Sequence, residues 1–153
     1  MFSRKQQYLL RVISFRMVFL SQVGKTAMFD FKEKVVLITG ASYGLGEQFA
    51  YDFAKAGADL ILTARSVEQL EVVGERCREV GSRVAVVPGD VSIEADVKKV
   101  ISAGIDSLGR IDVLINNAYY SDGQVKLLKN VYSGWQKKKK TIINIGSWHK
   151  DHL

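Results

Sequence analysis

From residue 29 onward, the apolar positions of the chain alternate between two periods. Short and nearly continuous runs of Val, Ile and Leu are typical of strands that are covered on both faces. Such runs predict five strands, at 34–39, 59–63, 83–87, 112–115 and 141–145.

Three segments between these strands repeat their apolar residues at the spacing of a helix face. The first is 45–56. The second begins with the capping-box pattern Ser66-x-x-Gln69, and Ser92 is predicted to cap the third. Each helix is expected to stop at a glycine: Gly57, Gly81 or Gly109. The stripes of the second and third helices are predicted to be Val67, Leu70, Val73, Cys77 and Val80, and Ile93, Val97, Val100, Ile101, Ile105 and Leu108.

Strands and helices therefore alternate with short connections. This order predicts an α/β fold, a doubly wound parallel sheet with helices on both faces. The segment 119–140 has a weaker pattern and is predicted to be a short, poor helix. It is still long enough for the crossover that delivers 141–145 as a fifth parallel strand.

Composition places the chain among soluble globular proteins. Its 153 residues, 47% apolar and 25% charged, are enough for one domain with a packed core. The single cysteine, Cys77, excludes an internal disulfide and any cysteine-based redox or zinc motif. A reducing compartment or a plain buried thiol is favoured.

Residues 1–28 differ from the rest of the chain. They hold five basic residues and no acid, whereas 29–153 carries only +1 of the net charge of +6. Arg11 and Arg16 interrupt the apolar stretch, so neither a secretory signal nor a membrane span is predicted. The leader resembles a mitochondrial presequence, or it is a spurious extension ahead of Met28. We therefore expect a folded domain at 29–153, located in the cytoplasm or, with a cleaved leader, in the mitochondrial matrix.

Two other clusters are predicted to have no ligand. The basic run 137–140 has no reading helix or aromatic platform beside it, so nucleic-acid binding is not predicted. His149 and His152 lack a carboxylate or thiol framework, so no metal site is predicted.

The sequence TGASYGLG at 39–46 places three glycines between the first strand and the first helix. Such a turn presents free backbone N–H groups and the positive end of a helix dipole at one point, which suits a pyrophosphate. Gly40 would make the sharp turn, Gly44 would let phosphates approach the main chain, and Gly46 would let the helix pack closely. The alternative is that all three are ordinary turn residues.

The end of the second strand bears on the choice of dinucleotide. An acid at this place holds the ribose 2′-hydroxyl of NAD, whereas an arginine receives the 2′-phosphate of NADP. Here the strand ends in Thr63-Ala64-Arg65, with no acid before Glu68. NADP(H) is therefore favoured over NAD(H). The alternative is that Arg65 is an exposed residue at a helix start.

Polar residues also follow the third and fourth strands. Asp90 and the sequence Asn116-Asn117-Ala118 come at carboxyl ends, where an open α/β sheet forms its ligand crevice. Together with the glycine turn, these motifs resemble those of the short-chain dehydrogenase/reductase family over 34–118, and the resemblance resumes at 142–147. It implies a Rossmann-like fold, truncated here after the fifth strand, and hydride transfer between a nicotinamide cofactor and a carbonyl or alcohol.

The resemblance assigns roles residue by residue. The pyrophosphate turn matches Gly40, Ser42, Tyr43, Gly44, Leu45 and Gly46. The adenine contact matches Asp90 with Val91. The motif beside the cofactor ribose matches Asn116, Asn117 and Ala118, followed by Tyr119 where the family usually has glycine.

Catalysis in the family uses a serine after the fifth strand and then a Tyr-x-x-x-Lys pair. Ser147 matches the serine, although a polar residue in a loose C-terminal tail is the alternative. The family's pair would come beyond Leu153. Tyr51 and Lys55 have the same spacing but lie in the first helix, where a surface pair is predicted. Asn130 is the candidate for the family's catalytic-site asparagine.

Without the family's later strands, 141–145 is predicted to be a sheet edge. Its residues Ile142, Ile143 and Ile145 point to both faces, and an unpaired apolar edge invites homo- or hetero-association.

Two interpretations remain open. One is an NADP(H)-dependent oxidoreductase, present as a partial chain, that acts on a carbonyl or alcohol substrate. The other is a non-catalytic nucleotide-binding fragment or pseudoenzyme. Turnover of NADPH with a carbonyl compound separates them.

Overall fold

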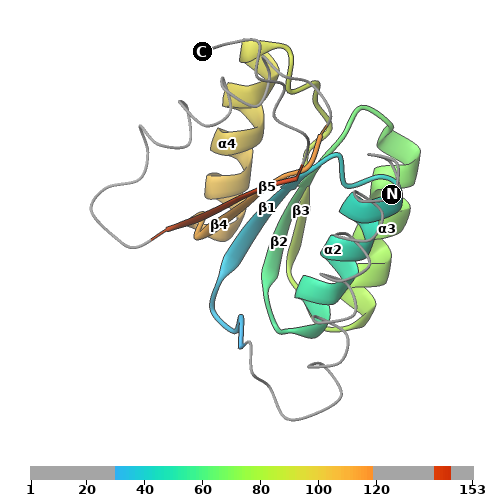
Figure 1. Ribbon diagram of the computed structural model, residues 1–153, viewed down its shortest axis with the longest axis vertical. Coiled ribbons are helices and arrows are strands. Elements are labelled where there is room, and N and C mark those ends of the chain that lie inside the picture. Colours follow the sequence, from blue (N-terminus) through green and yellow to red (C-terminus); the bar gives the residue numbers. More distant parts are fainter. Residues whose placement is uncertain (1–29, 119–139, 146–153) are drawn as a thin grey trace, which may run out of the picture. The chain divides into compact units, whose positions relative to one another are not determined.

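The computed structural model describes residues 30–118 and 140–145 of the chain (Figure 1). The chain divides into two units, Met1–Asp30 and Phe31–Leu153, and every described helix and strand belongs to the second. None of the helices within these residues is long and apolar enough to cross a membrane.

In the described part of the chain, five parallel strands form one sheet in the order β3-β2-β1-β4-β5 (Figure 1). They are β1 (Val35–Thr39), β2 (Asp59–Thr63), β3 (Val84–Val86), β4 (Val113–Asn116) and β5 (Thr141–Asn144). The predicted strands and their parallel arrangement are confirmed. Since the chain runs outward from β1 to β3 and then returns to the other side of β1, the order reverses between β1 and β4, which is where open α/β sheets bind ligands.

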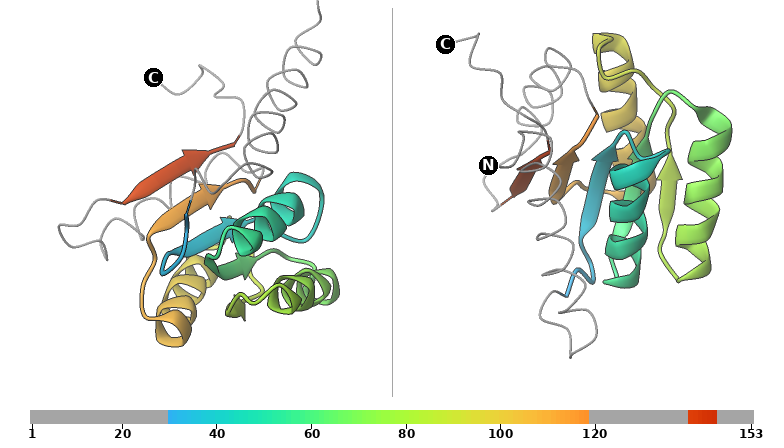
Figure 2. Two further views of the ribbon diagram at one scale, coloured as in Figure 1. Left: turned by 90° about the horizontal axis from the view of Figure 1, so that it is seen from below. Right: turned by 45° about the vertical axis from the view of Figure 1, so that its right-hand side comes forward.

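Within residues 30–118 and 140–145, three helices cover the sheet. They are α2 (Gly44–Lys55), α3 (Val67–Glu79) and α4 (Glu94–Leu108). The first two lie on one face and α4 lies on the other, as Figure 2 also shows. The doubly wound architecture is therefore confirmed for the described residues.

The core consists of two apolar clusters, one on each face of the sheet. Val36 and Ile38 of β1 belong to the cluster under α2 and α3, whereas Val35 and Leu37 belong to the cluster under α4. All five β1 residues are buried. Because a fully buried Val, Leu or Ile contributes about 1.5–3 kcal/mol, this central strand is firmly held, and so is the position of the turn that follows it.

Asp112 joins the amino ends of three strands. Its Oδ2 accepts a hydrogen bond from the backbone N–H of Val35 at 3.0 Å. Its Oδ1 accepts from Lys140 Nζ at 2.8 Å and from Arg110 at 2.7 Å. Asp112 is only 6% exposed. One buried carboxylate therefore connects β1, β4 and β5 at the edge opposite the predicted ligand crevice.

The two predicted helix caps have different outcomes: the position of Ser66 is confirmed but its capping box is not, and Ser92 is not the cap of α4. Ser66 occupies the N-cap position of α3, but its side chain makes no capping hydrogen bond, so no capping box with Gln69 forms. The N-cap of α4 is Ile93 rather than Ser92. Ser92 instead donates its backbone N–H to Asp90 Oδ1 at 2.9 Å, in a turn that precedes the helix.

The predicted helix ends are correct, but the predicted stripes are too long. Each expected glycine, Gly57, Gly81 and Gly109, has a positive φ after its helix, at 89°, 99° and 82°. Four residues assigned to apolar stripes are exposed: Val67, Val80, Ile93 and Ile105. Val67, Val80 and Ile93 lie at or next to the ends of their helices. Ile105 lies within α4, and Leu108 at the end of that helix still packs against the core.

Candidate functional site

The predicted cofactor-binding residues all lie at the carboxyl edge of the sheet. The glycine turn follows β1, Arg65 follows β2, Asp90 follows β3, and Asn117 and Ala118 follow β4. Because the strands are parallel, their carboxyl ends meet at one edge. The structure thus brings together segments that are far apart in the sequence.

The glycine turn has the left-handed backbone conformation that its sequence predicts. Gly40 and Gly44 have φ of 64° and 59°, a region that other residues rarely adopt. A Cβ at Gly40 would lie 3.1 Å from the Ala118 Cα. A Cβ at Gly46 would collide with the Gly40 carbonyl oxygen, so the absence of a side chain lets α2 pack directly against the turn.

Hydrogen bonds of Asn117 and Thr39 stabilise this turn. Thr39 Oγ1 accepts hydrogen bonds from the backbone N–H groups of Asn117 at 3.0 Å and Ala118 at 2.9 Å. Asn117 Nδ2 donates to the carbonyl oxygens of Thr39 at 3.1 Å and Gly40 at 3.3 Å. The end of β4 therefore fixes the path by which β1 enters the glycine turn.

The other residues of the turn differ in exposure. Ser42 is 7% exposed, whereas Tyr43 is 61% exposed and occupies the N-cap position of α2. Leu45 is half-buried. The side of the turn that faces solvent therefore carries Tyr43 and the backbone of Gly44.

The loop after β3 lies beside the end of β2. Gly89 donates its backbone N–H to the Ala64 carbonyl oxygen at 3.1 Å. Hydrogen bonds from the backbone and side chain of Ser92 lower the pKa of the Asp90 carboxyl, and the charge of Arg65 lowers it further. Asp90 is therefore an anion near Arg65, while Val91 is 8% exposed and packs in the cluster under α4.

Arg65 differs from the other arginines that the structure describes. Arg76, Arg78, Arg83 and Arg110 each form an ion pair with a carboxylate. Arg65 is exposed and makes no ion pair with any residue in the described ranges.

Asn116 pairs with a residue that sequence reasoning did not select. Its Nδ2 donates to Asn144 Oδ1 at 3.2 Å, and the two asparagines are register partners on β4 and β5. Asn116 is 0% exposed, and its Oδ1 has no hydrogen-bond partner among the described residues. A polar residue directly after the apolar pair Ile142-Ile143 was the available signal for Asn144.

Ser147, Asn130 and Tyr119 lie outside the described residues. The pair Tyr51 and Lys55 is described, and Lys55 Nζ lies 4.3 Å from the centroid of the Tyr51 ring. The prediction of an i,i+4 pair within the first helix is confirmed.

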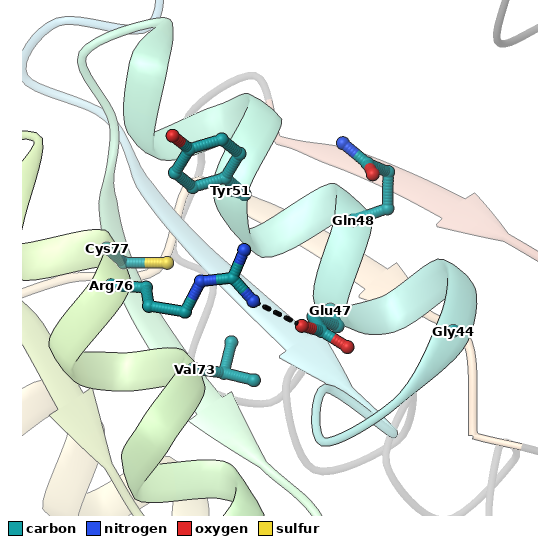
Figure 3. A pocket seen from close by; sticks show the side chains of 7 residues that line it. All are labelled: Gly44, Glu47, Gln48, Tyr51, Val73, Arg76 and Cys77. Carbon is teal, nitrogen blue, oxygen red and sulfur yellow. Dashed lines mark hydrogen bonds and ion pairs between the residues drawn. The ribbon is translucent and has the colours of Figure 1, made fainter.

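A pocket of about 200 Å³ lies between α2 and α3 (Figure 3). Arg76 and Glu47 form an ion pair of 2.7 Å across it, and Cys77 lines it without exposing its thiol. Burial raises the pKa of the Cys77 thiol to about 11, so this thiol is unreactive near neutral pH. Of the predicted cofactor-binding residues only Gly44 lines this pocket, which is therefore distinct from the carboxyl-edge site.

The sequence profile described as short chain dehydrogenase matches residues 34–137. Among similar curated proteins, 11-beta-hydroxysteroid dehydrogenase-like 4A of Arabidopsis thaliana is 52% identical over 86 residues, which are 56% of this chain and 29% of that protein. The 11-beta-hydroxysteroid dehydrogenase A of Sesamum indicum is 48% identical over 101 residues, which are 65% of this chain and 29% of that protein.

Solved structures show the same fold. The apo form of glucose dehydrogenase of Caenorhabditis elegans matches with a TM-score of 0.72 and 30% identity, over 78% of this chain and 56% of that one. A short chain dehydrogenase/reductase from Burkholderia phymatum in complex with NAD matches with a TM-score of 0.69 and 28% identity, over 76% of this chain and 50% of that one. The chain thus spans about half of these structures, and less than a third of the two curated relatives.

Proposed function

Because this chain belongs to the short-chain dehydrogenase family of oxidoreductases, we propose that it binds NADP(H) at the carboxyl edge of its sheet, for hydride transfer to or from a carbonyl or alcohol. The observation that carries the proposal is the glycine turn. Gly40 and Gly44 have positive φ where β1 enters α2, at the point where the strand order reverses.

The turn fits the diphosphate of a dinucleotide. A Cβ at Gly44 would meet no protein atom within 4 Å, so this side of the turn is open to a ligand. The first N–H groups of α2 lack partners within the helix and carry its positive dipole end, which favours an anion. Thr39 and Asn117 fix the backbone where β1 enters the turn, which reduces the conformational entropy lost on binding.

The preference for NADP(H) rests on Arg65. The guanidinium of Arg65 is exposed and forms no ion pair within residues 30–118 and 140–145, so it is available for charged, bidentate hydrogen bonds with a 2′-phosphate. The same position carries no acid that would favour the 2′-hydroxyl of NAD. Asp90 and Val91 would contact the adenine, and Asn116, Asn117 and Ala118 would lie beside the ribose.

When bound, NADPH supplies a hydride to the carbonyl carbon while a proton reaches the oxygen, so that an alcohol and NADP⁺ result. In this proposal Ser147 orients the carbonyl. The substrate class is a carbonyl or secondary alcohol. A hydroxysteroid is one candidate substrate, because two similar plant proteins are named 11-beta-hydroxysteroid dehydrogenases.

Titration of the full 153-residue chain with NADPH and NADH tests the binding proposal. Calorimetry and thermal unfolding should show saturable binding of both nucleotides, and NADPH should bind at the lower concentration. A folded sample whose thermal transition moves with neither nucleotide would overturn the proposal.

A second candidate is a chain that binds the nucleotide without catalysis. It is favoured by the position of Tyr51 and Lys55, which have the family's catalytic spacing but interact with each other on α2 rather than at the carboxyl edge. A panel of carbonyl compounds that includes steroid ketones distinguishes the two functions. Oxidation of NADPH with any of them rejects the second candidate, whereas tight binding without oxidation supports it.

We also propose that the chain associates through β5, the last strand of the described sheet. Ile142, Ile143 and Ile145 are half-buried there. Sedimentation velocity at several concentrations tests this, and a chain that stays monomeric throughout contradicts it.

We further propose a cytoplasmic location, with the mitochondrial matrix as the alternative. A fluorescent protein fused to residues 1–28 distinguishes the two compartments.

A further inference from the structure

The register of β5 on β4 is only weakly specified by its apolar residues. Ile142 packs with the cluster on the α4 face, whereas Ile143 packs with the cluster on the opposite face. Adjacent residues of a strand face opposite sides, so a slip by one residue still leaves an isoleucine on each face. Hydrophobic burial alone therefore allows more than one register.

Two polar pairs mark the register that the structure has. Just before the strand, Lys140 Nζ donates to Asp112 Oδ1 at 2.8 Å and to the Ile111 carbonyl oxygen at 2.7 Å. At the end of the strand, Asn116 Nδ2 donates to Asn144 Oδ1 at 3.2 Å. One pair thus lies at each end of β5.

The β4-side residue of each pair is buried, although Asn144 itself is exposed, so the loss of either β5-side partner leaves a buried polar group short of a hydrogen bond. Asp112 is 6% exposed and Asn116 is 0% exposed. A slip by one residue in either direction would place an isoleucine, Ile143 or Ile145, opposite Asn116. A buried amide facing a hydrocarbon side chain is unfavourable because its hydrogen bond is lost.

The pair of Asn116 and Asn144 is needed to fix the register because the residue before Lys140 is also a lysine. Lys139 precedes Lys140 in the sequence, so a slip by one residue in one direction would supply Asp112 with another ammonium group. The ion pair alone therefore does not distinguish these two registers. The asparagine pair does, because the same slip would remove Asn144 from Asn116.

We propose that Lys140 and Asn144 are positioning residues that together fix the register of β5. The importance of this register rests on the proposed function, because Ser147 follows Asn144 by three positions in the sequence. A slip of one residue would displace the strand by about 3.3 Å and exchange its faces. The carboxyl end of β5, from which the chain leads to Ser147, would move with it.

The test is nuclear magnetic resonance of the isotopically labelled full chain, which at 17.1 kDa is small enough for assignment. In the parent chain, backbone contacts should join Leu114 to Ile142, its register partner. In Lys140→Met/Asn144→Leu, the contact of Leu114 should move to Thr141, a shift of one residue. Each single variant should show both sets of contacts, with the shifted set in the minority.

Lys139→Met is the matched control, since it removes one charge of the same run and leaves both pairs intact. It should keep the parent contacts only. The proposal is overturned if the double variant keeps only the parent contacts, or if its β5 loses all contacts with β4. Should the double variant not fold, the single variants decide, and parent contacts alone in both overturn the proposal. No nucleotide is present, so this result is independent of the NADPH titration.

Discussion

Asn117 donates two hydrogen bonds to Thr39, one from its backbone to the Thr39 side chain and one from its side chain to the Thr39 backbone. The backbone N–H of Asn117 donates to Thr39 Oγ1 at 3.0 Å, and Asn117 Nδ2 donates to the Thr39 carbonyl oxygen at 3.1 Å. The two residues are 78 positions apart in the sequence. They join β1 and β4 where the strand order reverses, so the direction in which the chain enters the glycine turn depends on them.

We expect Thr39→Val to destabilise the fold and to weaken NADPH binding. The substitution keeps the size of the side chain but removes the acceptor for the N–H groups of Asn117 and Ala118, which costs about 1–3 kcal/mol. Denaturant unfolding and nucleotide titration measure the two effects.

Thr63→Val is the matched control for that variant. Thr63 is the register partner of Thr39 and is equally buried, but its Oγ1 has no hydrogen-bond partner among the described residues. This replacement should leave the free energy of unfolding unchanged or raise it, because an unsatisfied buried hydroxyl is removed. Equal destabilisation by both substitutions would show that the hydrogen bonds of Thr39 are not the cause.

Gly44→Ala should weaken nucleotide binding more than it weakens the fold. A Cβ there meets no protein atom within 4 Å, so the cost to stability is the backbone strain at φ 59°, about 1–2 kcal/mol. Gly109→Ala, at φ 82° and with equally open space, introduces similar strain far from the turn in the sequence. Only Gly44→Ala should lower the affinity for NADPH in calorimetry. Unchanged affinity in that variant would argue against diphosphate binding at this turn.

The sequence predicted the sheet well because its signals are local and strong. The run Val35–Thr39 is apolar at nearly every position, which is required of a strand buried on both faces. Gly40 and Gly44 could be assigned to a turn because few other residues adopt a positive φ. The convergence of Arg65 and Asp90 at one edge then followed from the parallel order of the strands.

The polar contacts were harder to predict. Ser66 and Ser92 have the residue type that caps helices, but a cap also requires a particular side-chain direction, and Asp90 bonds Ser92 instead. Lys140 and Asn144 have partners 28 positions away in the sequence, at the two ends of the neighbouring strand β4. No pattern of apolar spacing contains that information, because it depends on the register of the strands in three dimensions.

Arg65→Ser should change the preference between the two nucleotides. Loss of charged hydrogen bonds to a 2′-phosphate, worth about 1.5–3 kcal/mol, would lower the affinity for NADPH by roughly 10- to 150-fold. The affinity for NADH should change little, because that nucleotide has no 2′-phosphate. Arg83→Ser removes an exposed arginine near the amino end of β2 and should affect neither nucleotide. An equal loss of both affinities in Arg65→Ser would contradict the assigned role.

The acid sensitivity of the fold should depend on Asp112. Burial by itself raises the pKa of this carboxyl, but hydrogen bonds from Lys140, Arg110 and the Val35 backbone outweigh burial, so its pKa is lowered by folding. Such a group stabilises the fold above its unfolded pKa of about 3.9, and the stabilisation is lost as the pH falls from there through the lower folded pKa.

Below about pH 4, the free energy of unfolding of the parent chain should therefore fall more steeply than that of Asp112→Asn, which has no carboxyl to titrate. Denaturant unfolding between neutral and acid pH measures both slopes. Asp106→Asn, which removes an exposed carboxyl, should keep the steep slope of the parent chain, and a parent slope that persists in Asp112→Asn would assign the acid sensitivity to other groups.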